Sequence, residues 1–169
     1  MSTASMNSRE NSGAPRSIGC YHFAEVDDDN PWEPSPNEYD PGISTEAWLE
    51  LLQEPGLLEP DYGIVLRRWY EYGSPCTPSE IAEECGELSA RAYRTKLSTV
   101  GTRAILKGAA EPMAGRTYAE GVPVIAQRRK MTDKNRSGSV EYQLRPELVA
   151  ALDQLDMSAY PFSEPENED

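Results

Sequence analysis

Apolar residues recur along the middle of the chain at the spacings of amphipathic helices. From about Pro60 to Tyr72 they fall three and four residues apart and form one wide stripe, which ends at Gly73. Shorter stripes predict helices from Thr45 to Gln53 and from Ser79 to Cys85. These three segments predict a helical body that begins near residue 43.

The third of these helices carries local start and stop signals. Thr77 is followed by Pro78 and, three residues after the cap, by Glu80, which is the pattern of a capping box with proline in the first turn. Gly86 is suited to the left-handed residue that ends a helix. A further helix is predicted from Ser89 to about Lys107, so the two would form a helix-turn-helix pair.

The helix from Ser89 to Lys107 has two different faces. The apolar face consists of Tyr93, Leu97, Val100 and Ala104. The opposite face consists of Arg91, Arg94, Thr95, Ser98 and Thr102. Small hydroxyl side chains beside arginines let a helix approach a phosphate backbone closely. An ordinary solvated helix face is the alternative interpretation.

A β-hairpin is predicted after this helix. Residues 140–145 alternate between apolar and polar side chains, the period of a half-buried strand, and the first strand is expected from Val122 to Arg128. The cations near the hairpin tip are Arg128, Arg129, Lys130, Lys134 and Arg136. Asn135 adds a neutral hydrogen-bonding group. This tip is interpreted as a wing that contacts phosphates, and Pro146 opens a last helix.

The order of elements predicts an α+β fold of the winged helix-turn-helix type, with four to five helices and a β-wing of two or three strands. Low apolar content predicts a disordered acidic tail over residues 1–42 and another over residues 158–169. The folded domain is expected to span residues 43–157.

Charge is unevenly distributed along the chain. The net charge is −13, and it divides into −11 for residues 1–62, +5 for residues 63–145 and −7 for residues 146–169. The total disfavours a nucleic-acid partner, because contacts with phosphates supply most of the non-specific affinity. The basic centre still allows such a partner, and the acidic ends are typical of solvated tails.

Candidate catalytic chemistry is sparse. His22 is the only histidine, and Cys20, Cys76 and Cys85 show no CxxC spacing, so a zinc site is not indicated. No carboxylate pair in the folded region has a recognisable acid–base spacing. We therefore expect no enzyme, no cofactor and no metal. The chain shows neither a signal peptide nor a membrane-spanning run, which predicts a cytoplasmic protein without membrane contact.

Two stretches resemble a known family. The first stretch consists of Trp69-Tyr70-Glu71-Tyr72-Gly73, Thr77-Pro78-Ser79-Glu80-Ile81-Ala82-Glu83-Glu84-Cys85-Gly86 and the helix around Tyr93. The second stretch consists of Leu144-Arg145-Pro146-Glu147-Leu148 and the strand before it. Over about residues 44–157 the chain resembles the N-terminal accessory module of McrB-like 5-methylcytosine restriction proteins. The resemblance implies a role in target or partner recognition. It implies no GTP hydrolysis, because the GxxxxGK[ST] phosphate loop is absent.

The sequence favours a small non-enzymatic protein that binds nucleic acid, with duplex DNA as the expected form. The expected contacts are Arg91, Arg94, Thr95, Ser98, Arg128, Arg129, Lys130, Lys134, Asn135 and Arg136. Two alternatives stay open. The same fold could bind a partner protein while its acidic tails serve as linear motifs, or the acidic chain could mimic DNA and occupy a nucleic-acid-binding enzyme. The sequence indicates no oligomeric state.

Overall fold

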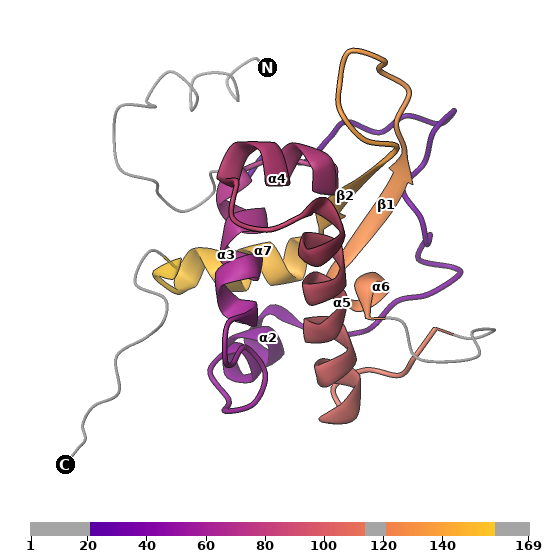
Figure 1. Ribbon diagram of the computed structural model, residues 1–169. Coiled ribbons are helices and arrows are strands. Elements are labelled where there is room, and N and C mark those ends of the chain that lie inside the picture. Colours follow the sequence, from indigo (N-terminus) through magenta and orange to yellow (C-terminus); the bar gives the residue numbers. More distant parts are fainter. Residues whose placement is uncertain (1–20, 114–120, 158–169) are drawn as a thin grey trace.

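The computed structural model describes residues 21–113 and 121–157. Over these residues the fold is α+β, with six helices and one two-stranded antiparallel sheet (Figure 1). The helices are α2 (Thr45–Leu52), α3 (Tyr62–Tyr72), α4 (Pro78–Cys85), α5 (Ala90–Leu106), α6 (Val122–Ile125) and α7 (Pro146–Gln154). The strands are β1 (Ala126–Lys130) and β2 (Val140–Leu144). The α+β class is as predicted, but the six described helices exceed the predicted four to five, because Val122–Ile125 form a helical turn where a strand was expected.

The ends of α4 form as the sequence predicts. Thr77 Oγ1 accepts the N–H of Glu80 at 3.0 Å, and the N–H of Thr77 donates to Oε1 of Glu80 at 3.0 Å, which completes a capping box. Gly86 ends the helix in the left-handed region at φ 72°. Ser89 then caps α5, because its Oγ accepts the N–H of Ala92 at 3.1 Å. Local interactions therefore fix both ends of the turn between the two helices.

The apolar face of α5 packs into the core. Its buried residues include Tyr93, Leu97, Val100 and Ala104, as predicted. Trp69 of α3 is 1% exposed, and its indole N–H donates to the carbonyl of Tyr93 at 3.3 Å. The Trp69 ring also meets Tyr142 of β2 edge to face, with centroids 5.7 Å apart. Trp69 therefore connects α3, α5 and the sheet.

The first strand is shorter than predicted. It was expected to begin at Val122, but Val122–Ile125 form the one-turn helix α6, and β1 begins at Ala126. Pro123 lies in the first turn of α6, where its missing N–H costs no helical hydrogen bond. All four side chains of α6 are buried, and α6 packs against α5. This packing outweighs the strand preference of the β-branched residues.

Single residues extend the sheet at both edges. Arg128 and Tyr142 are partners in the β1–β2 ladder. Glu33 pairs with Arg128 through two backbone hydrogen bonds of 2.8 Å, and Cys76 pairs with Tyr142 through bonds of 3.2 and 2.8 Å. Four chain segments therefore meet in one row at the middle of the hairpin. The sheet itself has two strands, within the predicted range of two or three.

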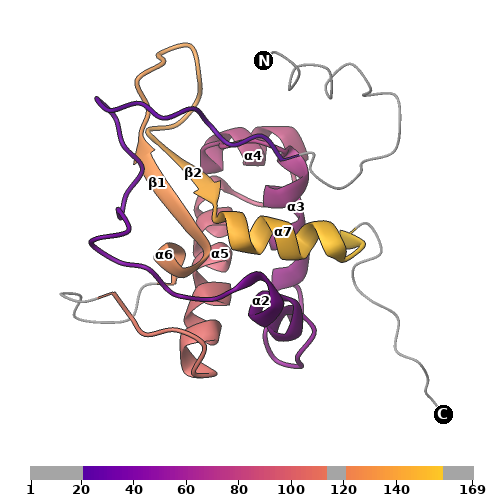
Figure 2. The ribbon, with the colours of Figure 1, turned by 180° about the vertical axis from the view of Figure 1, so that it is seen from behind.

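Residues 21–43, which we call the strap, cross the side of the hairpin away from α5 (Figure 2). The hydroxyl of Tyr21 accepts the N–H of Leu144 at 3.1 Å, and the N–H of Ala24 donates to Oε1 of Gln143 at 2.7 Å. Tyr21 is itself buried. The strap therefore belongs to the folded domain.

This packing corrects the predicted disordered tail over residues 1–42, which is wrong for residues 21–42. The physical reason is the second face of β2. Alternation left Glu141 and Gln143 on an open face, yet both are buried, because the strap covers that face. Residues 1–20 and the predicted acidic tail over residues 158–169 lie outside the described residues.

Candidate nucleic-acid interface

The hairpin and the first turns of α5 enclose a groove of about 380 Å³. Arg91 and Arg94 line it from α5, and Arg128 lines it from β1. Ser79 at the start of α4 and Tyr142 on β2 contribute further lining. No carboxylate belongs to the described lining of this groove. The groove therefore brings together the helix and the hairpin that were predicted to bind nucleic acid.

The register of the hairpin decides which of its cations face the groove. Arg128 pairs with Tyr142, and Arg129 pairs with Glu141. Successive side chains of a strand point to opposite faces of the sheet. Arg128 and Lys130 therefore share the groove face, whereas Arg129 lies on the face that the strap covers.

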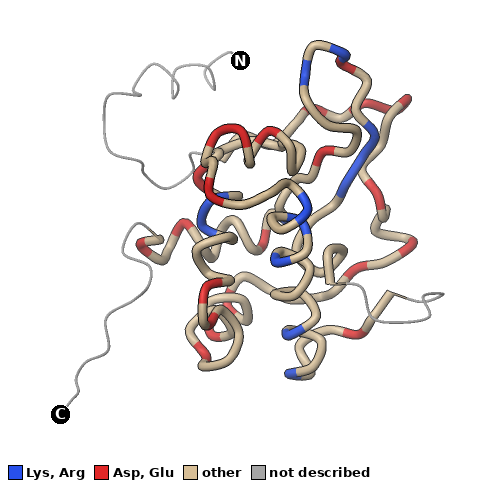
Figure 3. The backbone as a smooth tube through the Cα atoms, in the orientation of Figure 1, with Lys and Arg blue, Asp and Glu red and all other residues tan. Residues whose placement is uncertain are grey.

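Most of the described cations are already bound within the protein. Ion pairs engage Arg67, Arg68, Lys96, Lys107, Arg129 and Arg136. Arg103 and Arg145 donate to backbone carbonyls. Within residues 21–113 and 121–157, the cations whose charged groups have no partner are Arg91, Arg94, Arg128, Lys130 and Lys134. These free cations lie on the first turns of α5 and on the hairpin (Figure 3), and all of them belong to the predicted set.

Two predicted contacts, Arg129 and Arg136, hold the hairpin in place. Arg129 Nε lies 2.8 Å from Glu141 Oε2, and its guanidinium stacks on the ring of Trp32 at 4.3 Å. Arg136 lies 2.7 Å from Glu80 Oε1 and 3.2 Å from Glu141 Oε1. Breaking a pair that involves the buried carboxylate of Glu141 would leave an uncompensated charge. We therefore remove both arginines from the candidate interface and assign them to the attachment of the hairpin to the strap and α4.

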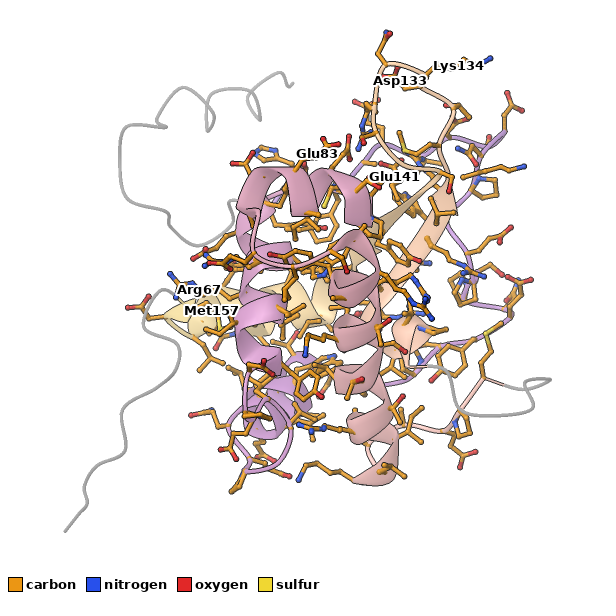
Figure 4. All side chains as sticks on the ribbon, viewed as in Figure 1. Arg67, Glu83, Asp133, Lys134, Glu141 and Met157 are labelled. Carbon is orange, nitrogen blue, oxygen red and sulfur yellow. The ribbon has the colours of Figure 1, made fainter. Side chains whose placement is uncertain are left out.

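The neutral residues of the predicted contact set also divide into exposed residues and a residue that is used in packing. Ser98 Oγ accepts the N–H of Gly121 at 3.3 Å, so Ser98 packs against the start of α6. Thr95 is exposed on α5. Asn135 is exposed in the hairpin loop beside Lys134, which points away from the body of the protein (Figure 4). Thr95 and Asn135 stay candidates, whereas Ser98 is reassigned to packing.

The second half of α5 has a structural role. Arg103 donates to the carbonyls of Leu57 and Glu59, the first at 3.2 Å. Lys107 donates to the carbonyl of Pro55 at 3.0 Å. These contacts hold the loop between α2 and α3. The free charge of α5 is therefore confined to its first turns, next to the hairpin.

Sequence reasoning missed two residues that line the groove, Ser79 and Tyr142, and one that anchors the strap, Trp32. Ser79 was assigned only to the start of a helix, and Tyr142 only to the core face of a strand. Trp32 lies in the segment that was predicted to be a disordered tail. The tryptophan within an otherwise polar, acidic stretch is the one signal that could have indicated an anchor for the strap.

Glu80 is expected to make the protein sensitive to acid. Hydrogen bonds from Arg136 hold the pKa of Glu80 below its usual value. A carboxyl with a lowered pKa in the folded state stabilises the protein above its unfolded pKa, and this contribution is lost as the pH falls through the folded pKa. Between about pH 5 and pH 3, the native chain should therefore lose more unfolding free energy than a Glu80→Gln variant.

Denaturant unfolding at a series of pH values tests this expectation. Glu84→Gln is the matched control, since Glu84 is exposed on the same helix and makes no ion pair with the described residues. Its pH dependence should follow that of the native chain. If Glu80→Gln and Glu84→Gln lost stability equally on acidification, the pairing with Arg136 would not be the source of the effect.

Because the comparisons with known proteins found no match, any functional assignment of this chain rests on the groove. No protein-family model, curated protein or solved structure matches this chain. In the described parts of the chain, no group of three or more His, Cys, Asp or Glu could hold a metal ion. None of the helices there combines the length and apolar character that crossing a membrane requires.

Proposed function

We propose that this chain is a small non-enzymatic protein of winged-helix type that binds nucleic acid, with duplex DNA as the expected ligand. One observation carries the proposal. The cations that have no partner among the described residues gather around one groove and the adjoining hairpin, and that groove has no carboxylate in its described lining. Unpaired cations gathered in this way on an acidic chain fit a polyanionic ligand.

The order of elements supports the winged-helix part of the proposal. Along the chain, the helix α3 is followed by the strand-like residue Cys76, by the helices α4 and α5 joined by a short turn, and, after the one-turn helix α6, by the hairpin β1–β2. In such folds the second helix of the pair carries residues that contact nucleic acid, most often near its N-terminus. The free cations of α5 occupy that part of the helix.

In the proposed mechanism, Arg91, Arg94 and Arg128 neutralise phosphates along the groove. Lys130 and Lys134 extend the same contact along the hairpin. Neutral hydrogen bonds from Thr95 and Asn135 would add orientation, because such groups commonly donate to phosphate oxygens. Contacts of this kind position a protein on a duplex without reading its sequence. The net charge of −13 should keep the affinity modest.

Single substitutions that remove one charge each test the proposal. Arg94→Ala and Arg128→Ala should each weaken binding of a short duplex about three- to tenfold at roughly 0.1 M salt, because each deletes a phosphate contact. Each should also lower the slope of log affinity against log salt by about one. Fluorescence anisotropy of a labelled duplex across a salt series measures both quantities.

Arg67→Ala is the matched control, because it removes the same charge from α3, where Arg67 pairs with Glu71 at 3.0 Å. It should leave affinity and slope nearly unchanged. If the native chain failed to bind duplex DNA, single-stranded DNA and RNA at about 50 mM salt, where phosphate contacts are strong, the proposal would be overturned. A partner protein with an acidic surface would then become the better candidate ligand for the free cations.

We also propose a link to restriction, which rests on the sequence resemblance to McrB-like proteins. The test uses two duplexes of the same sequence, one with 5-methylcytosine and one without it. A module that recognises the modified target should bind the methylated duplex more tightly. Equal affinity for the two duplexes would remove this link and leave general nucleic-acid binding.

A further inference from the structure

The strap places three aspartates in a turn that is bonded to the backbone of Lys130, one of the free cations of the hairpin. Residues 27–30 form a turn in which the N–H of Asn30 donates to the carbonyl of Asp27 at 3.0 Å. The side-chain amide of Asn30 donates to the carbonyl of Lys130 at 2.8 Å. This turn is therefore held against the end of β1. Asp28 and Asp29 lie in the same turn and are exposed.

The turn cannot move away from the hairpin without losing its anchors. Trp32 stacks on Arg129 at 4.3 Å, and Glu33 pairs with the backbone of Arg128 through two bonds of 2.8 Å. On the other side of the turn, Ala24 is bonded to Gln143 of β2. Acidic residues in a free tail would have a diffuse effect. Here the two attachments keep three carboxylates at one side of the hairpin.

We infer that Asp27, Asp28 and Asp29 are specificity-determining residues that keep a polyanion off the strap side of the hairpin and confine it to the groove side. The inference rests on the proposed function. At about 0.1 M salt the electrostatic screening length is about 10 Å, so carboxylates attached beside Lys130 act on any phosphate that approaches it from their side. Repulsion from these carboxylates limits how far a bound duplex extends around the hairpin, and it lowers the contribution of Lys130.

A gain of binding tests the inference, because loss of the folded groove would be expected to weaken binding. The full chain with Asp27→Asn, Asp28→Asn and Asp29→Asn should bind a short duplex roughly three- to tenfold more tightly at about 50 mM salt. The control, Glu46→Gln with Glu50→Gln and Glu59→Gln, removes the same charge from exposed positions on α2 and the loop after it. In Figure 1, α2 lies at the end of the molecule away from the hairpin tip, so this control should gain less than twofold.

The Lys130→Ala substitution gives a second measurement, the loss of duplex affinity in two backgrounds, whose ratio does not depend on the net charge of the chain. In the variant with the three aspartates replaced by asparagine, Lys130 should contribute fully to duplex binding. Removing Lys130 should therefore lower the affinity by a factor about three times larger in that variant than in the native chain. A larger gain from the asparagine variant than from the glutamine control, together with this coupling, supports the inference. Equal gains from both variants would overturn it in favour of net charge. Binding by the native chain without any gain would overturn it and leave the proposed function standing, and no binding by any variant would overturn both.

Discussion

Replacing Trp69 by alanine is expected to lower the free energy of unfolding by about 3–5 kcal/mol. The side chain is 1% exposed, it donates a hydrogen bond to the carbonyl of Tyr93, and it packs edge to face on Tyr142. Its removal would leave a cavity where α3, α5 and the sheet meet. A domain of this size has only about 5–15 kcal/mol of stability. Denaturant unfolding followed by circular dichroism measures the change.

Trp69→Phe separates packing from the hydrogen bond. Phenylalanine fills much of the same volume but cannot donate to Tyr93, so we expect a smaller loss of about 1–3 kcal/mol. A loss below about 1 kcal/mol for Trp69→Ala would show that the indole does not fill the core, since buried tryptophans normally cost several times more. It would also contradict the orientation of α3 described above.

Replacing Gly101 by alanine is expected to destabilise the protein by about 3 kcal/mol, although the same change inside a helix normally stabilises by about 1 kcal/mol. A Cβ atom on Gly101 would lie 1.9 Å from the carbonyl oxygen of Gly121. The obstacle is backbone, which cannot rotate away as the end of a side chain can. Alanine would therefore push the start of α6 away from α5, and α6 leads directly into β1.

Thr95→Ala is the control on the same helix, because Thr95 is exposed and alanine has the higher helix propensity. It should change the unfolding free energy by less than about 0.5 kcal/mol or raise it slightly. Thermal unfolding of both variants gives the comparison. If Gly101→Ala were as stable as Thr95→Ala, α5 and α6 would not approach each other as closely as the structure shows.

Five of the six described helices, all except α6, could be predicted because their signals are local. The capping box at Thr77, the left-handed Gly86 and the apolar face around Leu97 depend on residues within one or two turns, so the sequence contains them directly. The second strand was also found, since apolar and polar residues alternate in the sequence over Val140–Leu144, which form β2. These elements account for most of the predicted α+β architecture.

The parts that could not be predicted depend on contacts between distant residues. The residues of α6 have strand-forming side chains, and only their packing against α5 makes them helical. The strap looks like a tail because its few apolar residues are widely spaced and make contacts with distant parts of the chain, as Tyr21 does with Leu144 and Trp32 does with Arg129. A pattern of one aromatic residue at a time has no period to detect.

The candidate site also has features that the sequence predicted and features that depend on contacts between distant residues. The sequence placed basic residues on α5 and the hairpin, which carry the free cations of the described residues. It could not tell that Arg129 and Arg136 are occupied by Glu141 and Glu80, whereas Arg94 and Arg128 are not. That distinction depends on strand register and on carboxylates far away in the sequence. A count of cations therefore overestimated the free charge of the hairpin.

The row of four residues across the hairpin also bears on aggregation. A two-stranded sheet normally offers two edges whose free backbone groups can pair with another chain. In this protein Glu33 occupies the outer edge of β1 at its middle residue, and Cys76 does the same for β2. Strand addition by a partner, or by a second copy, would have to displace the strap or the segment before α4. The hairpin is therefore protected against edge-to-edge association.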